Sequence, residues 1–148
     1  MIISFTRDDG TVEEVTTNEL SAREAAAIEH AMGGTQWQRV EGLLRLQDPT
    51  ALLAVLWAFR KREQPDLKFD DFDVPNWKRR LKAGTERSEI EDLFDNVIVQ
   101  ALGKSEDAQI DLMVPALKKG AHNPADVDDA LEAVGKGHLV KHRTTLTD

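Results

Sequence analysis

The pattern of apolar and polar positions centres on residues 51–59, a run of nine consecutive apolar side chains. Asp48 precedes the run as a helix N-cap, and Pro49 suits the first helical position, where its missing N–H is no loss. Three cations follow at 60–62, where the helix dipole favours positive charge. A helix that is apolar on every side lies in a core or a membrane, and a bilayer needs about 20 such residues. The sequence therefore predicts a buried central helix over 48–63.

Two short β-prone runs precede this helix, at residues 2–6 and 11–16. Asp8, Asp9 and Gly10 lie between them and form a turn signal, so the pattern predicts a short N-terminal β-hairpin. An isolated hairpin is only marginally stable in water. We therefore expect it to pack on the helices or to add to a sheet in a neighbouring subunit.

Helical spacing of apolar residues predicts two more helices before the central one. Ser21 and Glu24 have the spacing of a capping box, and Gly33 and Gly34 end the helix that it opens. A short helix follows over 36–46.

Three further helices are predicted after the central one. Ser88 and Glu91 form a second capping box, for a helix that runs to about residue 102. The pattern over 105–119 is also helical, and Pro115 should kink or split it. The last of the three helices is predicted over residues 123–135.

These patterns predict a mainly α fold, a small helical bundle around the central apolar helix at 48–63 with the short N-terminal β-hairpin. Pro75 suggests a boundary, so we expect a hairpin and helical core over 1–75 and a helical region over 76–135. Periodicity is lost over 136–148, where we expect a flexible tail.

Composition and charge restrict the classes of function. The chain has 148 residues, no cysteine and a formal net charge of −8. Residues 1–75 carry 8 basic and 14 acidic side chains, and 76–148 carry 11 and 13. This balance argues against a duplex nucleic-acid binder, which needs clustered positive charge. The missing cysteines exclude disulfides and thiolate metal sites. We expect no signal peptide, no membrane span and a cytoplasmic location.

Candidate chemistry along the chain is weak. Residues 102–105, Leu-Gly-Lys-Ser, end like a phosphate-binding loop, but the glycine that the motif needs at position 98 is an isoleucine. His138 and His142 have one-turn spacing without a third metal ligand. The acidic segment around Asp66, Asp70, Asp71 and Asp73 lacks the glycine and glutamate of a calcium loop and is interpreted as a solvated loop. We therefore expect no enzyme, no cofactor and no metal site.

The first half of the chain resembles the tail assembly chaperones of long-tailed phages. The residues that carry the resemblance are the helix Ser21 to Met32, the apolar helix Leu53 to Arg62 with its Trp and basic end, and the segment Asp66 to Phe72, DLKFDDF. The match covers roughly residues 1–75. It implies a non-enzymatic protein in the host cytoplasm that binds the tape-measure protein and assists assembly of the tail tube. In that family a longer product often arises by ribosomal frameshifting.

A chaperone for an apolar helical client needs an apolar groove, and acidic surroundings would attract basic client segments. Candidate groove residues are apolar side chains in excess of what a small core needs. They are Trp37, Leu53, Leu56, Trp57 and Phe59, joined by Phe69 and Phe72 of the acidic segment. The competing interpretation of each is an ordinary core residue. Homo-oligomerisation is left open.

Three alternatives remain. One is a structural subunit of the phage particle, such as a head–tail connector or tail accessory protein, that uses the hairpin for strand addition. Another is a regulator that binds nucleic acid through 77–82, WKRRLK, and the basic tail. The last is an enzyme with a dispersed site, which no motif supports.

Overall fold

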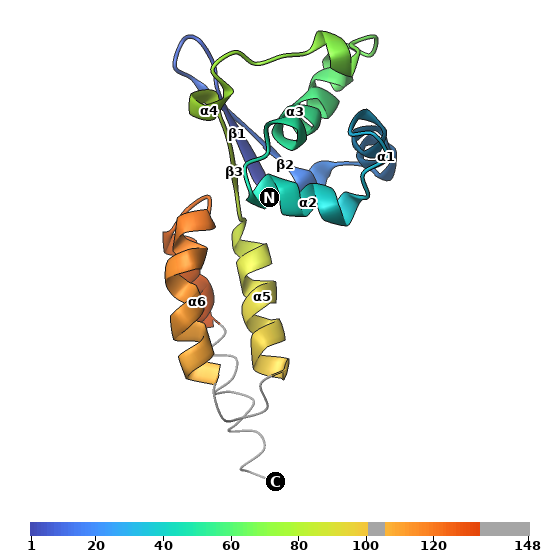
Figure 1. Cartoon of the computed structure of the whole chain (residues 1–148). Coiled ribbons are helices and arrows are strands. Elements are labelled where there is room, and N and C mark those ends of the chain that lie inside the picture. The colour runs from blue at the N-terminus through green and yellow to red at the C-terminus, as the bar shows by residue number, and fades with distance from the viewer. Residues whose placement is uncertain (101–105, 134–148) are drawn as a thin grey trace. The chain divides into compact units, whose positions relative to one another are not determined.

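The computed structural model describes residues 1–100 and 106–133, which divide after Gly84 into two compact units (Figure 1). We call them the N-terminal and C-terminal units. The predicted boundary at Pro75 is wrong, because residues 81–84 form a strand of the N-terminal sheet.

Moving the boundary changes the distribution of charge. The basic run at 77–82 now belongs to the N-terminal unit, so residues 1–84 carry 12 basic and 14 acidic side chains, a net of −2. Residues 85–148 carry 7 basic and 13 acidic side chains, a net of −6. The acidic excess of the chain therefore lies mainly in the C-terminal unit, whereas division at residue 75 had placed it in the first half.

The N-terminal unit contains a three-stranded antiparallel sheet in the order β2-β1-β3. Its strands are β1 (Ile2–Thr6), β2 (Val12–Thr16) and β3 (Leu81–Gly84). The two N-terminal β-prone runs form β1 and β2, which pair antiparallel, and β3 pairs with the other side of β1. The sequence did not predict β3.

Helices pack on one face of this sheet. They are α1 (Ala22–Ala31), α2 (Trp37–Arg45) and α3 (Pro49–Glu63), and Figure 1 shows all three gathered on the same side of the strands. Short helical turns connect the larger elements: η1 (Thr17–Glu19), η2 (Phe69–Asp71) and α4 (Trp77–Arg80). The side chain of Ser21 accepts from Glu24 N–H and that of Glu24 from Ser21 N–H, so the predicted capping box is confirmed.

The core lies between the sheet and α3. Asp48 caps α3 and Pro49 occupies its first turn, as predicted, and seven residues of the helix are buried: Ala51, Leu52, Ala54, Val55, Leu56, Trp57 and Ala58. Alternation along β1 turns Ile3 and Phe5 toward the helices, and Leu81 and Ala83 lie opposite them on β3. Ile28 of α1, Val40 and Leu44 of α2, and Met1 and Val74 also belong to this core.

The C-terminal unit has a small core of its own. Helices α5 (Arg87–Gln100) and α6 (Glu106–Gly120) run side by side (Figure 1), and residues 125–133 are also helical. Buried side chains from these elements form one cluster: Ile90, Phe94, Ile110, Ala121, Val127 and Ala130. Thr85 pairs with this unit, since its N–H donates to Gly120 and its carbonyl accepts from His122.

The expectation for the start of the first helix of the C-terminal unit is wrong. Helix α5 begins at Arg87, before Ser88, so Ser88 is not its N-cap, and Glu91 pairs with Arg87 at 2.9 Å instead. Helix α6 continues through Pro115, so the proline does not split it. The segments 102–105 and 136–148, including His138 and His142, lie outside the described residues.

The mainly α fold class is confirmed. A single bundle around the 48–63 helix is not confirmed, because the chain divides into two units and α3 packs against a sheet as well as helices. None of the described helices is long and apolar enough to cross a membrane.

Gln47 covers the outer edge of β3. Its side-chain amide donates to the Ala83 carbonyl at 2.8 Å and its side-chain carbonyl accepts from Ala83 N–H at 2.8 Å. The side chain thus replaces a neighbouring strand at this residue. Gln47 itself has φ of 60°, an uncommon conformation for a residue with a side chain.

The Gln47 pairing should stabilise the N-terminal unit. Gln47→Ala leaves both Ala83 backbone groups without their partner and should lower the free energy of unfolding by about 1–3 kcal/mol. Gln47→Gly removes the same hydrogen bonds but tolerates the positive φ, so it should be less destabilising than Gln47→Ala. Chemical denaturation and hydrogen exchange of the Ala83 amide measure both effects. Unchanged exchange at Ala83 in both variants would refute the assignment.

Candidate partner-binding groove

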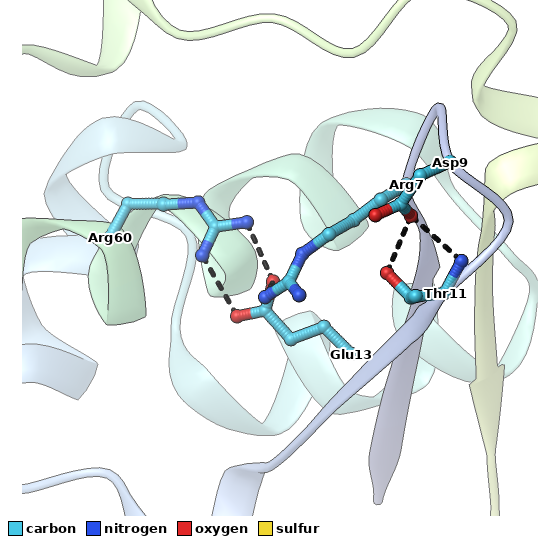
Figure 2. A network of polar contacts seen from close by, with 5 residues as sticks. All are labelled: Arg7, Asp9, Thr11, Glu13 and Arg60. Carbon is cyan, nitrogen blue, oxygen red and sulfur yellow. Dashed lines mark hydrogen bonds and ion pairs between the residues drawn. The ribbon is translucent and has the colours of Figure 1, made fainter.

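The C-terminal end of α3 is fixed to the sheet by a bidentate ion pair. The Arg60 guanidinium donates to the two carboxylate oxygens of Glu13 at 2.8 and 2.6 Å, and Arg7 approaches the same carboxylate at 3.2 Å (Figure 2). Hydrogen bonding from Arg60 holds the pKa of Glu13 below its ordinary value. Figure 2 also shows Asp9 accepting two hydrogen bonds from Thr11, which close the β1–β2 turn.

Two guanidinium groups contact the ring of Phe5 on β1. Arg60 lies 5.8 Å and Arg80 4.9 Å from the ring centroid. Arg80 also donates to the Thr6 carbonyl at 3.0 Å and pairs with Asp8 at 3.2 Å. This arginine of the basic run at 77–82 therefore stabilises the sheet.

Arg62 connects α3 to the start of α1. Its guanidinium donates to Glu24 at 2.8 and 2.9 Å and to the Glu19 carbonyl at 2.9 Å. Glu24 is also the carboxylate of the Ser21 capping box. The hydrogen bonds from Arg62, followed by those from Ser21, lower the pKa of Glu24 to about 2.

Trp57 fixes the segment that follows α3. Its indole N–H donates to the Leu67 carbonyl at 3.0 Å, and Phe69 packs edge-on against the ring with centroids 5.5 Å apart. The Lys61 ammonium lies 4.9 Å from the centroid of the same indole. Trp57, which is buried in the core, therefore also holds segment 65–70 beside α3.

A groove of about 550 Å³ lies between α1, α3 and segment 65–70. A second hollow of about 280 Å³ continues from it toward the start of α1. Ala27, Trp57 and Lys61 line both, so we treat them as one feature, the α1–α3 groove.

The wall formed by α1 follows one helical stripe. Arg23, Glu24, Ala27, His30 and Ala31 line the groove, at spacings that place them on one face over about two turns. Two of these side chains, Ala27 and Ala31, are alanines, so the α1 wall carries little bulk where it lines the groove with Trp57. A helix or a short peptide of about 12 Å would match this wall.

The walls differ in charge. Glu24 is neutralised by Arg62, whereas neither Arg23 nor Lys61 has an ion-pair partner among the described residues. Segment 65–70 contributes Asp66, Lys68 and Asp70 to the opposite side.

Two of the seven predicted partner-binding residues, Trp57 and Phe69, line the groove. Leu56 has no exposed surface, so its assignment to a partner-binding surface is corrected to the core. The other four are half-buried, pack against that core and do not line the groove: Trp37, Leu53, Phe59 and Phe72. Trp37 donates its indole N–H to Glu41, and Arg62 lies over Phe59.

Sequence reasoning missed the residues of the α1 wall. Ala27 carries no chemical signal. The adjacent Ile28 is buried, so the apolar periodicity of α1 marks its core face and not the stripe that lines the groove. The signal that was available is the pair Ala27 and Ala31, four residues apart beside a predicted aromatic floor.

Within the described parts of the chain, no three His, Asp or Glu side chains gather as a metal site requires. Asp66, Asp70, Asp71 and Asp73 are all exposed. Comparison with family models, curated proteins and solved structures found no match for this chain. Function is therefore inferred from the groove and from the sequence.

Trp57→Phe should release segment 65–70. The change removes the hydrogen bond to Leu67 and should lower the free energy of unfolding by about 1–2 kcal/mol. The Asp71 and Phe72 amides, which donate to the carbonyls of Lys68 and Phe69, should exchange faster. Trp77→Phe, outside the groove, is the matched control and should leave this exchange unchanged. Equal exchange in wild type and Trp57→Phe would contradict the role of the indole.

The Arg62–Glu24 pair should make stability depend on acid pH. Because the folded pKa of Glu24 is about 2 against an ordinary 4.5, its contribution is present above pH 4.5 and is lost as pH falls toward 2. The pair is solvated, so solvent screening keeps the effect small. Arg62→Met should move the Glu24 pKa toward its ordinary value in an NMR titration and reduce the loss of stability below pH 4.5. An unchanged titration would show that Arg62 is not the cause.

Proposed function

We propose that this chain is a non-enzymatic tail assembly chaperone of a long-tailed phage, which binds a helical segment of the tape-measure protein in the α1–α3 groove. The tail-tube protein is its second proposed partner, and the host cytoplasm its proposed location. The observation that carries the proposal is the groove, which has an aromatic floor of Trp57 and Phe69 and a wall opened by alanines. The resemblance of residues 1–75 to such chaperones supports the same function.

The groove has the properties of a helix-binding site. Its α1 wall is one helical stripe, its floor is aromatic, and the mouth carries charged side chains. An amphipathic helix packs in such a groove with residues spaced three and four apart on the floor. Because Arg60 and Arg62 fix the end of α3 to the sheet and to α1, the groove is held in shape before a client binds.

A second candidate function is a structural subunit of the phage particle, either a head–tail connector or a tail accessory protein. The observation that favours it is the position of β2 at the edge of the sheet, with Val12 56% exposed. A strand of a neighbouring subunit would add beside β2. Such a subunit remains in the finished particle, whereas a chaperone leaves.

A co-expression pull-down tests the proposed function. Tagged full-length chain is expressed with the tape-measure and tail-tube proteins encoded beside it, and we expect it to retain and solubilise the tape-measure protein. Ala27→Leu narrows the groove and should reduce retention at least fivefold. Ala26→Leu changes the exposed neighbour of Ala27, outside the groove, and should have no effect. Equal unfolding midpoints of the two variants show that Ala27→Leu is folded.

Two results would contradict this function. Absence of retention by the wild type, with the chain found in purified particles, favours the structural subunit. Equal retention by both alanine variants shows that the client binds elsewhere than in the groove.

A further inference from the structure

The three cations at the end of α3 differ in what they contact. Arg60 pairs with Glu13 and Arg62 with Glu24, so each guanidinium is neutralised by a carboxylate of the same unit. Lys61, between them, takes part in none of the ion pairs found among the described residues. Its ammonium lies over Trp57 and lines both parts of the groove.

Lys61 limits what can occupy the groove. An occupant that covers Trp57 must also remove water from the ammonium 4.9 Å from that ring. Burial of a charge without a partner is costly, whereas an opposite charge in hydrogen-bonding geometry offsets part of that cost. A wholly apolar or basic occupant would leave Lys61 uncompensated, so the groove favours an occupant that brings a carboxylate.

The part of the groove near the start of α1 also favours an occupant that carries carboxylates. Arg23 lies there without an ion-pair partner among the described residues, and the only carboxylate lining that part, Glu24, is bound to Arg62. Asp66 and Asp70 line the other part, on segment 65–70. The charge of the groove therefore changes along its length, from cationic beside Arg23 to mixed beside Asp66.

We infer that the occupant of the α1–α3 groove is an amphipathic helix whose apolar stripe is flanked by carboxylates at the end that meets Lys61 and Arg23. This inference rests on the proposed function, since it takes the groove as the client site, and it specifies the client by its charge. From the sequence, the net negative charge of the chain indicated a client with basic segments. The charges that line the groove indicate the opposite, a client with carboxylates at this end.

Two synthetic peptides test the inference. Each has about 18 residues, long enough for substantial helicity, and the same Leu/Ala apolar stripe. One carries glutamates beside one end of the stripe and the other carries lysines there. Binding of each labelled peptide to the full chain is measured by fluorescence anisotropy at low and high salt. We expect the wild type to bind the glutamate peptide at least about fivefold tighter, with the difference shrinking in high salt.

Charge reversal supplies the decisive comparison. Lys61→Glu should weaken or reverse the preference for the glutamate peptide. Lys61→Met keeps an unbranched chain over Trp57 and should reduce the preference without abolishing it, because Arg23 remains. Lys78→Glu is the matched control, because Lys78 also lies over a tryptophan, Trp77, but outside the groove. It should preserve the preference of the wild type.

The outcomes separate the inference from the proposed function. Equal binding of both peptides by the wild type, or an equal effect of Lys61→Glu and Lys78→Glu, overturns the inference. If neither peptide binds while the tape-measure protein is retained, the inference fails and the chaperone function stands. If the glutamate peptide binds through Lys61 but no tape-measure protein is retained, the inference stands and that function fails.

Discussion

The N-terminal unit depends on how the cationic end of α3 is neutralised. Arg60 pairs with Glu13 of β2 and Arg62 with Glu24 of α1, so two residues within one helical turn connect three elements. The dipole of α3 favours cations at this end even without partners, and the two glutamates convert that local preference into tertiary contacts. Because Trp57 lies one turn earlier, the same anchoring fixes the floor of the groove.

Local signals predicted the parts of this fold that local chemistry decides. Capping acts within one helical turn, through Asp48 with Pro49 at the start of α3 and Ser21 with Glu24 at the start of α1. The N-termini of both helices are found as expected. Strand β3 was missed because Leu81, Lys82, Ala83 and Gly84 have little β propensity of their own. Their pairing with β1 joins residues about 80 positions apart in the sequence, and no pattern in the segment reveals it.

Only the aromatic residues of the groove could be predicted from the sequence. Aromatic residues such as Trp57 and Phe69 are conspicuous in a sequence, so the floor was found. The wall at Ala27 depends on the small size of the alanine side chain. In a sequence, an alanine within a helix more often indicates high helix propensity than a groove. Leu56 and Trp57 are neighbours in one apolar run, and only the packing of α3 decides that one is fully buried and the other reaches the groove.

The carboxamide of Gln47 has a consequence for how copies of this chain can associate. A sheet with two open edges can add strands at both and extend without limit, which is the route to fibres. Here the β3 edge is already occupied at Ala83 by a side chain of the same molecule. Any association through strands is thereby directed to the β2 side, where two copies related by a twofold axis would complete each other and growth would stop at a pair.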